Sequence, residues 1–151
     1  MKAPDAAVLA TILDQRFDVG TVALFDTSAA VQGQAVKAQP SPLAIEANVT
    51  RYDPGHISVQ LDKPAPAGAA LMVSENYYPG WRATVDGRPA TVGRADYVLI
   101  GVALPTGARS VDLTFHSASF ETGKTITLVA LALSILGMLA GFWSARTHRS
   151  M

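Results

Sequence analysis

The residues of this chain that could bind a ligand gather in one stretch, SENYYPGWRATVDGRPA, residues 74–90. Tyr77 and Tyr78 each carry an apolar ring with a polar tip, which suits contact with a sugar ring or a lipid headgroup. Asn76 and Arg82 place hydrogen-bond donors beside them. These four residues form a candidate surface for a sugar or a partner. A purely structural role at the corner of a sandwich explains the same aromatic residues.

Patterns that would indicate catalysis or metal binding do not occur in the sequence. No metal-binding spacing joins the three histidines, and there is no Gly-x-Ser-x-Gly elbow and no glycine-rich phosphate loop. Carboxylate pairs of the glycosidase kind are placed by the fold, so Glu75 with Asp86 or Asp96 stays open. We expect no catalytic residue, no metal and no cofactor in this chain taken alone.

Two turns shape the aromatic stretch. A Pro-Gly pair, residues 79–80, predicts a type II turn, because proline supplies a fixed φ and glycine a positive one. An Asp-Gly pair, residues 86–87, is preferred in two-residue hairpin turns of type I′. We expect Trp81 to fill the core of the domain, because aromatic side chains bury the most area. The structural residues of this corner are then Pro79, Gly80, Trp81, Asp86 and Gly87.

A second polar cluster stands in the sequence GRADY, with Arg94, Asp96 and Tyr97. We expect a loop between strands that carries one surface ion pair, a contact worth under about 1 kcal/mol. Contact with a membrane-embedded partner is the alternative role for this cluster.

An uncharged run of residues from Thr125 to Ala145 predicts a helix that crosses a membrane, because about 20 such residues span the hydrocarbon of a bilayer. A buried core helix is usually shorter and rarely apolar on every face. The 12 basic and 12 acidic residues balance, so no broad field attracts nucleic acid. We expect the lipid bilayer as a partner and no nucleic acid.

The charges around this run predict its orientation. Arg146, His148 and Arg149 follow it, so the positive-inside rule places residues 146–151 in the cytoplasm and the preceding domain outside. The first 18 residues lack the apolar region of a signal peptide. We therefore expect this chain to be the tail of a longer membrane protein whose earlier helices set its topology.

The remaining sequence predicts a mainly β fold. Residues 1–25 contain a short helix (5–17) and a strand (21–25), and residues 26–42 read as a connection rich in Ala, Gln, Ser and Pro. From residue 43 onward, short apolar runs end in Gly or Pro turns, the first of them at Asp53-Pro54-Gly55. This pattern predicts an antiparallel β-sandwich, jelly-roll-like, over residues 43–120.

The order of motifs resembles a known family. These motifs are Tyr78-Pro79-Gly80-Trp81, Val85-Asp86-Gly87, Leu104-Pro105-Thr106-Gly107 and Val111–Phe115, followed directly by an apolar helix. Over residues 70–145 the chain resembles the C-terminal end of YfhO-type bacterial membrane proteins, which look like GT-C glycosyltransferases. In that family many membrane helices precede this region and the chemistry is expected in their loops, so no catalytic residue carries over.

The resemblance implies a non-catalytic, extracytoplasmic C-terminal domain and membrane anchor in the bacterial inner membrane, acting in cell-envelope glycosylation. The partners that it implies are the lipid bilayer, the membrane-embedded remainder of such a protein, and a glycan. The alternative is an independent single-pass envelope protein whose sandwich binds a protein partner or scaffolds a complex.

Overall fold

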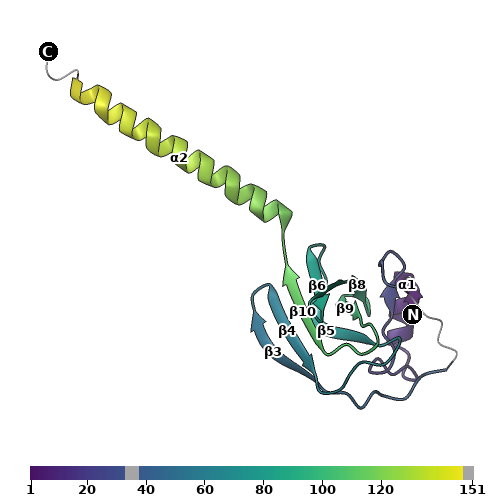
Figure 1. Cartoon of the computed structure of the whole chain (residues 1–151). Helices are drawn as coiled ribbons and strands as arrows, with labels where there is room; N and C mark the ends of the chain where they lie inside the picture. Colours follow the sequence, from purple (N-terminus) through teal and green to yellow (C-terminus); the bar gives the residue numbers. More distant parts are fainter. Residues whose placement is uncertain (33–37, 148–151) are drawn as a thin grey trace. The chain divides into compact units, whose positions relative to one another are not determined.

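The computed structural model describes residues 1–32 and 38–147. Residues 33–37 of the expected connection and residues 148–151 of the expected tail lie outside the described residues. The chain divides into two compact units, Met1–His116 and Ser117–Met151. Among the described residues, the first unit contains all the strands and the second is built on one helix (Figure 1).

Two five-stranded sheets make up the first unit, and all their neighbouring strands are antiparallel except β1 and β2. The first sheet has the order β3 (Ala47–Asp53), β4 (His56–Leu61), β10 (Ser110–Phe115), β6 (Trp81–Val85) and β7 (Arg88–Ala90). The second sheet has the order β1 (Lys2–Ala3), β2 (Phe25–Asp26), β8 (Val92–Ala95), β9 (Leu99–Ala103) and β5 (Ala70–Asn76).

The core lies between the two sheets and follows the alternation of apolar residues along the strands. Ile57 and Val59 of β4, with Leu113 of β10, are buried from the first sheet. They pack in one cluster with Ile100 and Val102 of β9 in the second sheet. Burying each such side chain contributes about 1.5–3 kcal/mol relative to leaving it exposed. The predicted mainly β, antiparallel sandwich is confirmed.

The N-terminal segment belongs to this sandwich, because β1 and β2 extend its second sheet. Helix α1 (Asp5–Ile12) ends before the expected residue 17. The carboxylate of Asp14 accepts hydrogen bonds from the backbone and the side chain of Arg16, and this local pairing competes with further helical turns. The helix is therefore shorter than its apolar pattern indicated.

The expected strand over residues 21–25 is wrong in extent, since only Phe25 and its successor pair as β2. Val22 and Leu24 are buried with Val8 of α1 in a separate small cluster. Ala23 and Phe25 pack in a different cluster, so the side chains of this segment alternate as in a strand although its first four residues are not paired in a sheet.

Phe25 fills space that two glycines leave open. A Cβ built on Gly101 would lie 2.5 Å from the ring of Phe25, and one on Gly93 would lie 3.2 Å from it. Because real Cβ atoms do not approach this closely, glycine at residue 101 is what allows the ring to lie against β9. The residues that precede the expected sandwich are thus packed into its second sheet.

The second unit contains α2 (Ala118–Thr147), which includes the whole of the expected span, residues 125–145. Its segment Ala118–Leu139 is long and apolar enough to cross a membrane, and none of this segment is buried in the protein. The hydroxyls of Thr125, Thr127 and Ser134 each donate to the carbonyl oxygen four residues earlier, at 2.8 to 2.9 Å. The helix therefore satisfies these polar groups internally, as a lipid environment requires.

Candidate binding surface

The aromatic turn connects β5 to β6. The N–H of Trp81 donates to the carbonyl oxygen of Tyr78 at 3.3 Å, and Gly80 between them has φ of +129°. A Cβ at Gly80 would lie 2.6 Å from the carbonyl oxygen of His116 and 3.1 Å from a ring atom of Phe115. Glycine is required here twice over, for its backbone conformation and for the close approach of the chain that leaves β10.

Trp81 does not fill the centre of the core as we expected. Its side chain is half-buried and packs against the margin of the cluster between the sheets. Its ring contacts that of Phe115, its register partner on β10, with centroids 5.4 Å apart and planes at 54°. The alternation of β6 did place Trp81 on the same face as Ala83 and Val85, but it is the first residue of the strand, where the second sheet covers it less.

The four residues of the predicted surface differ in their exposure to solvent. Tyr77 is half-buried against the core, and its N–H donates to the carbonyl oxygen of Val98 at 2.7 Å. Tyr78 is 61% exposed, and Asn76 and Arg82 are exposed on either side of the turn. Tyr78 therefore offers an accessible ring, whereas the backbone of Tyr77 is tied to the turn before β9.

A fifth aromatic residue, Tyr52, joins this region and was missed from the sequence. Its hydroxyl donates a hydrogen bond to the carboxylate of Glu75, which raises the pKa of Tyr52. Tyr52 stands at the end of β3 in the first sheet, whereas Glu75 lies on β5 in the second sheet. The Asp-Pro-Gly turn predicted the hairpin that carries Tyr52, but no local pattern pairs it with a residue of the other sheet.

The second turn is separated from the aromatic one by the length of β6. Asp86 and Gly87 have φ values of 50° and 75°, the geometry of a type I′ turn. The carboxylate of Asp86 accepts hydrogen bonds from the N–H groups of Arg109 (3.1 Å) and Ser110 (2.9 Å). These bonds hold the pKa of Asp86 below its usual range, the bond from Ser110 most strongly. This carboxylate therefore fastens the start of β10 and does not meet Glu75.

The GRADY cluster is a loop only in part: Arg94 lies in β8, whereas Asp96 and Tyr97 lie in the turn between β8 and β9. Its guanidinium pairs with the carboxylates of Asp5, at 2.6 Å, and Asp26. The carboxylate of Asp96 accepts the N–H of Leu24 at 2.9 Å, and burial raises the pKa of Asp96. The cluster thus connects the N-terminal segment to the second sheet through three contacts.

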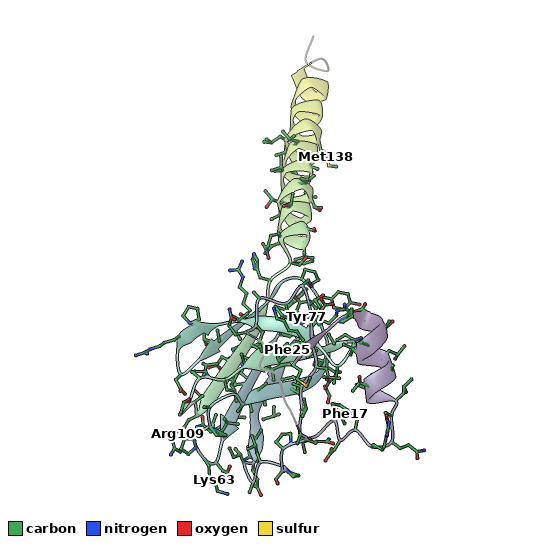
Figure 2. The ribbon with its side chains drawn as sticks, turned by 90° about the vertical axis from the view of Figure 1, so that its right-hand side faces the viewer. Phe17, Phe25, Lys63, Tyr77, Arg109 and Met138 are labelled. Atoms are coloured by element: carbon green, nitrogen blue, oxygen red, sulfur yellow. The ribbon has the colours of Figure 1, made fainter. Side chains whose placement is uncertain are left out.

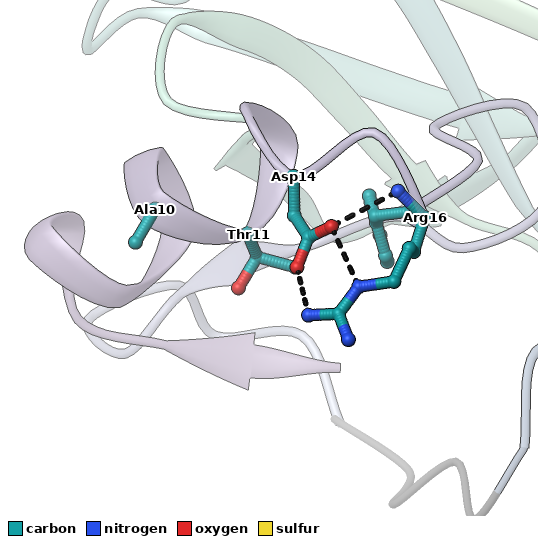
Figure 3. A pocket seen from close by; sticks show the side chains of 5 residues that line it. Ala10, Thr11, Asp14 and Arg16 are labelled. Carbon is teal, nitrogen blue, oxygen red and sulfur yellow. Dashed lines mark hydrogen bonds and ion pairs between the residues drawn. The ribbon is translucent and has the colours of Figure 1, made fainter.

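Concave surfaces lie away from the aromatic turn. Figure 3 shows a shallow depression at the end of α1, lined by Ala10, Thr11, Asp14, Arg16 and Phe17, where the charged groups of Asp14 and Arg16 satisfy each other. A larger groove of about 590 Å³ lies where the 39–46 segment passes the 65–70 turn. Within residues 1–32 and 38–147, no group of three or more His, Cys, Asp or Glu is placed to hold a metal ion.

Comparison with known proteins identifies the family. The profile described as "Bacterial membrane protein YfhO" matches residues 29–127. A protein of Bacillus subtilis (strain 168), described as "Uncharacterized protein YfhO", is 29% identical over 65 residues, which are 43% of this chain and 8% of that protein. The chain matches less than a tenth of that relative, and no solved structure matches it. The profile match runs from the core residue Ala29 through strands β3 to β10 into α2, and the chain therefore belongs to the YfhO family of bacterial membrane proteins.

Proposed function

We propose that this chain is the non-catalytic C-terminal, extracytoplasmic domain and membrane anchor of a glycosyltransferase-like membrane protein that acts in cell-envelope glycosylation. The family match carries the proposal, because it runs without interruption from the sandwich into the apolar helix. In the Bacillus subtilis relative the matched region is only 8% of the protein, which leaves most of its length for other segments. The link to glycosylation rests on the resemblance of YfhO-type proteins to GT-C glycosyltransferases.

The roles of the carboxylates support a non-catalytic sandwich. Asp86 fastens the start of β10, Asp26 pairs with Arg94, and Asp112 accepts a hydrogen bond of 2.6 Å from the hydroxyl of Ser58. Asp62 accepts the N–H of Glu46 at 2.7 Å. Each of these groups has a structural partner, whereas a catalytic pair of carboxylates would face a shared substrate site.

The distribution of charge supports the proposed extracytoplasmic placement of the sandwich. Arg146, His148 and Arg149 follow the apolar run, whereas Glu121 and Lys124 precede it, so the excess of positive charge lies on the C-terminal side. In the proposed orientation, α2 crosses the membrane, the C-terminal residues are cytoplasmic and the sandwich faces the cell envelope.

A specific observation favours the second candidate, an envelope protein whose sandwich binds a protein partner. β3 is an edge strand, and every one of its residues is exposed. Val49 and Tyr52 are large hydrophobic residues among them. An exposed edge of this length offers unpaired backbone groups to an added strand.

The size of the native protein separates the two candidates. An antibody against the sandwich should detect, in membranes of the source bacterium, a protein far larger than the 15.8 kDa of this chain. A band at about the size of the chain would favour the single-pass scaffold instead. Reading the DNA upstream of Met1 for hydrophobic segments in frame gives an independent check.

Loss of the gene then tests the glycosylation role. Mass spectrometry of cell-envelope polymers should show that a sugar substituent is missing in the deletion strain and restored by the intact gene. The same gene lacking the sandwich and α2 should restore it poorly. An unchanged envelope composition in the deletion strain would contradict the proposal.

A further inference from the structure

The aromatic residues of the sandwich are unevenly distributed. All four tyrosines, Trp81 and Phe115 lie at the end where three turns meet, namely the β3–β4 hairpin, the Tyr78–Trp81 turn and the turn before β9. Figure 2 labels Tyr77 at this end and the charged residues Lys63 and Arg109 at the opposite one. We call this region the aromatic end, defined by Tyr52, Tyr77, Tyr78, Trp81, Tyr97 and Phe115.

Much of this aromatic surface is exposed to solvent in the isolated chain. Tyr52 is 66% exposed, Tyr97 40% and Phe115 39%. Single exposed apolar residues are ordinary, but a group of them on one face indicates an interaction site. The hydroxyls of the tyrosines make this surface amphipathic rather than purely apolar, which suits a boundary between water and an apolar phase better than a dry protein interface.

Two backbone hydrogen bonds fix the end of β10 to this region. The N–H of Phe115 donates to the carbonyl oxygen of Gly55 at 2.8 Å, and that of His116 donates to Gly80 at 3.0 Å. Only Ser117 then separates His116 from Ala118, the first residue of α2. Because a residue spans at most about 3.6 Å, the chain path alone limits how far the aromatic end stands from a bilayer that α2 enters.

The length of α2 fits the same arrangement. Seven residues, 118–124, precede the uncharged run that begins at Thr125. They form about 10 Å of helix, a few ångströms more than the roughly 5–7 Å of headgroup layer on one side of a bilayer. When the uncharged run lies in the hydrocarbon, Ala118 lies near the outer edge of the headgroups. Phe115 and His116 lie three and two positions before Ala118, and they are the residues whose N–H groups bond to the β3–β4 hairpin and to the Tyr78–Trp81 turn.

From these relationships we propose that the aromatic end rests in the headgroup layer of the bilayer and acts as an interfacial anchor for the sandwich. Tyr and Trp are enriched at such interfaces because their rings accept an apolar environment while their polar groups reach water. The exposed guanidinium of Arg82 beside the turn suits lipid phosphates. The inference rests on α2 crossing the membrane, which is part of the proposed function, but it does not depend on glycosylation.

Fluorescence quenching tests this contact, because the chain has only two tryptophans. The full chain carrying Trp143→Phe, which leaves Trp81 as the reporter, is reconstituted into phosphatidylcholine vesicles with a spin label on some headgroups. The control carries Trp143→Phe, Trp81→Phe and Lys63→Trp, which moves the reporter to an exposed position at the charged end. Flotation with the vesicles and resistance to carbonate extraction establish first that α2 is inserted.

We expect the headgroup label to quench Trp81 at least twofold more strongly than the Lys63→Trp reporter, with the opposite order for iodide in solution. Equal quenching of both reporters in a protein that floats with the vesicles would overturn the anchor and leave the membrane insertion of α2 intact. A response of Trp81 to soluble N-acetylglucosamine oligomers without headgroup quenching would also overturn it, by assigning the surface to a sugar. Failure to float would instead contradict the anchoring role of α2 in the proposed function.

Discussion

The backbone N–H of His116 donates a hydrogen bond of 3.0 Å to the carbonyl oxygen of Gly80, and so holds the exit of β10 against the aromatic turn. The same turn brings Trp81 onto the ring of Phe115. The turn between β5 and β6 is thus bonded directly to His116, which precedes α2 by two positions. Changes in this turn should affect the stability of the sandwich at its point of attachment to α2.

Gly80→Ala should destabilise the sandwich more than a glycine substitution elsewhere. At Gly80 the new Cβ would meet the carbonyl oxygen of His116 at 2.6 Å, in addition to the positive φ of +129°. Gly107→Ala is the matched control, because Gly107 has φ of +87° but no atom within 4 Å of the new Cβ. We expect a loss of about 1–2 kcal/mol for the control and about 3 kcal/mol or more for Gly80→Ala. Denaturant unfolding of the detergent-solubilised chain measures both, and equal losses would remove the role assigned to the His116 contact.

Trp81→Ala should cost less than truncation of a core residue. Trp81 is half-buried and contacts Phe115, so we expect a loss of about 2 kcal/mol, below the 3–5 kcal/mol typical of a fully buried aromatic residue. Leu113→Ala is the comparison, because Leu113 is 0% exposed, and it should cost about 3–4 kcal/mol. The unfolding midpoints of the two variants in urea show which substitution destabilises the protein more. A larger loss for Trp81→Ala would place this residue in the core after all.

The contact between Phe25 and Gly101 predicts a non-additive pair of substitutions. Gly101→Ala places a Cβ 2.5 Å from the ring of Phe25 and should destabilise the protein by about 2 kcal/mol. Phe25→Ala removes a buried ring, yet it also makes room for that Cβ. The double variant should therefore be more stable than the sum of the single losses predicts, by about 1–2 kcal/mol. Strict additivity in the double-mutant cycle would mean that the N-terminal segment does not pack on β9.

Two carboxylates should give opposite dependences of stability on pH. Hydrogen bonds from Ser28 and then from Arg94 hold the pKa of Asp26 far below its ordinary value. The contribution of Asp26 to the free energy of unfolding is therefore complete above the unfolded-state pKa of about 3.9. That contribution is lost as the pH falls below this value. Burial raises the pKa of Asp96. The free energy of unfolding therefore falls as the pH rises from the unfolded-state pKa of Asp96 to its higher folded-state pKa.

Asparagine substitutions separate these two contributions. Asp26→Asn should lower stability at pH 7 and reduce its loss on acidification. Asp96→Asn should leave stability at pH 7 unchanged or higher, since an amide oxygen can still accept the N–H of Leu24 and asparagine tolerates the positive φ of 44°. Thermal midpoints measured between about pH 3 and pH 7 test both, and a marked destabilisation by Asp96→Asn at pH 7 would contradict the assigned role of burial.

The sequence predicted what local patterns determine. Alternation placed Ile57, Val59 and Leu113 in the core, and the Asp86-Gly87 pair has the positive φ values expected of a type I′ turn. The length and apolar character of residues 125–145 predicted the helix that now contains them.

The sequence could not indicate contacts between distant segments. Arg94 pairs with residues 68 and 89 positions away, and this pairing fastens the N-terminal segment to β8. The strand β8 contains Gly93 and Ala95, which are residue types depleted in strands, and it forms because neighbours on both sides complete its pairing. The partial burial of Trp81 likewise depends on how far the second sheet extends over the start of β6.

The orientation of the sandwich is the central claim, and cysteine labelling tests it most directly. Thr106 lies in an exposed turn, and the chain has no cysteine of its own. Thr106→Cys is introduced into the native gene of the source bacterium, with the unsubstituted protein as background, and spheroplasts are treated with a maleimide that does not cross membranes. We predict labelling in intact spheroplasts that does not increase on lysis. Labelling only after lysis would place the sandwich in the cytoplasm and contradict its assignment as an extracytoplasmic domain.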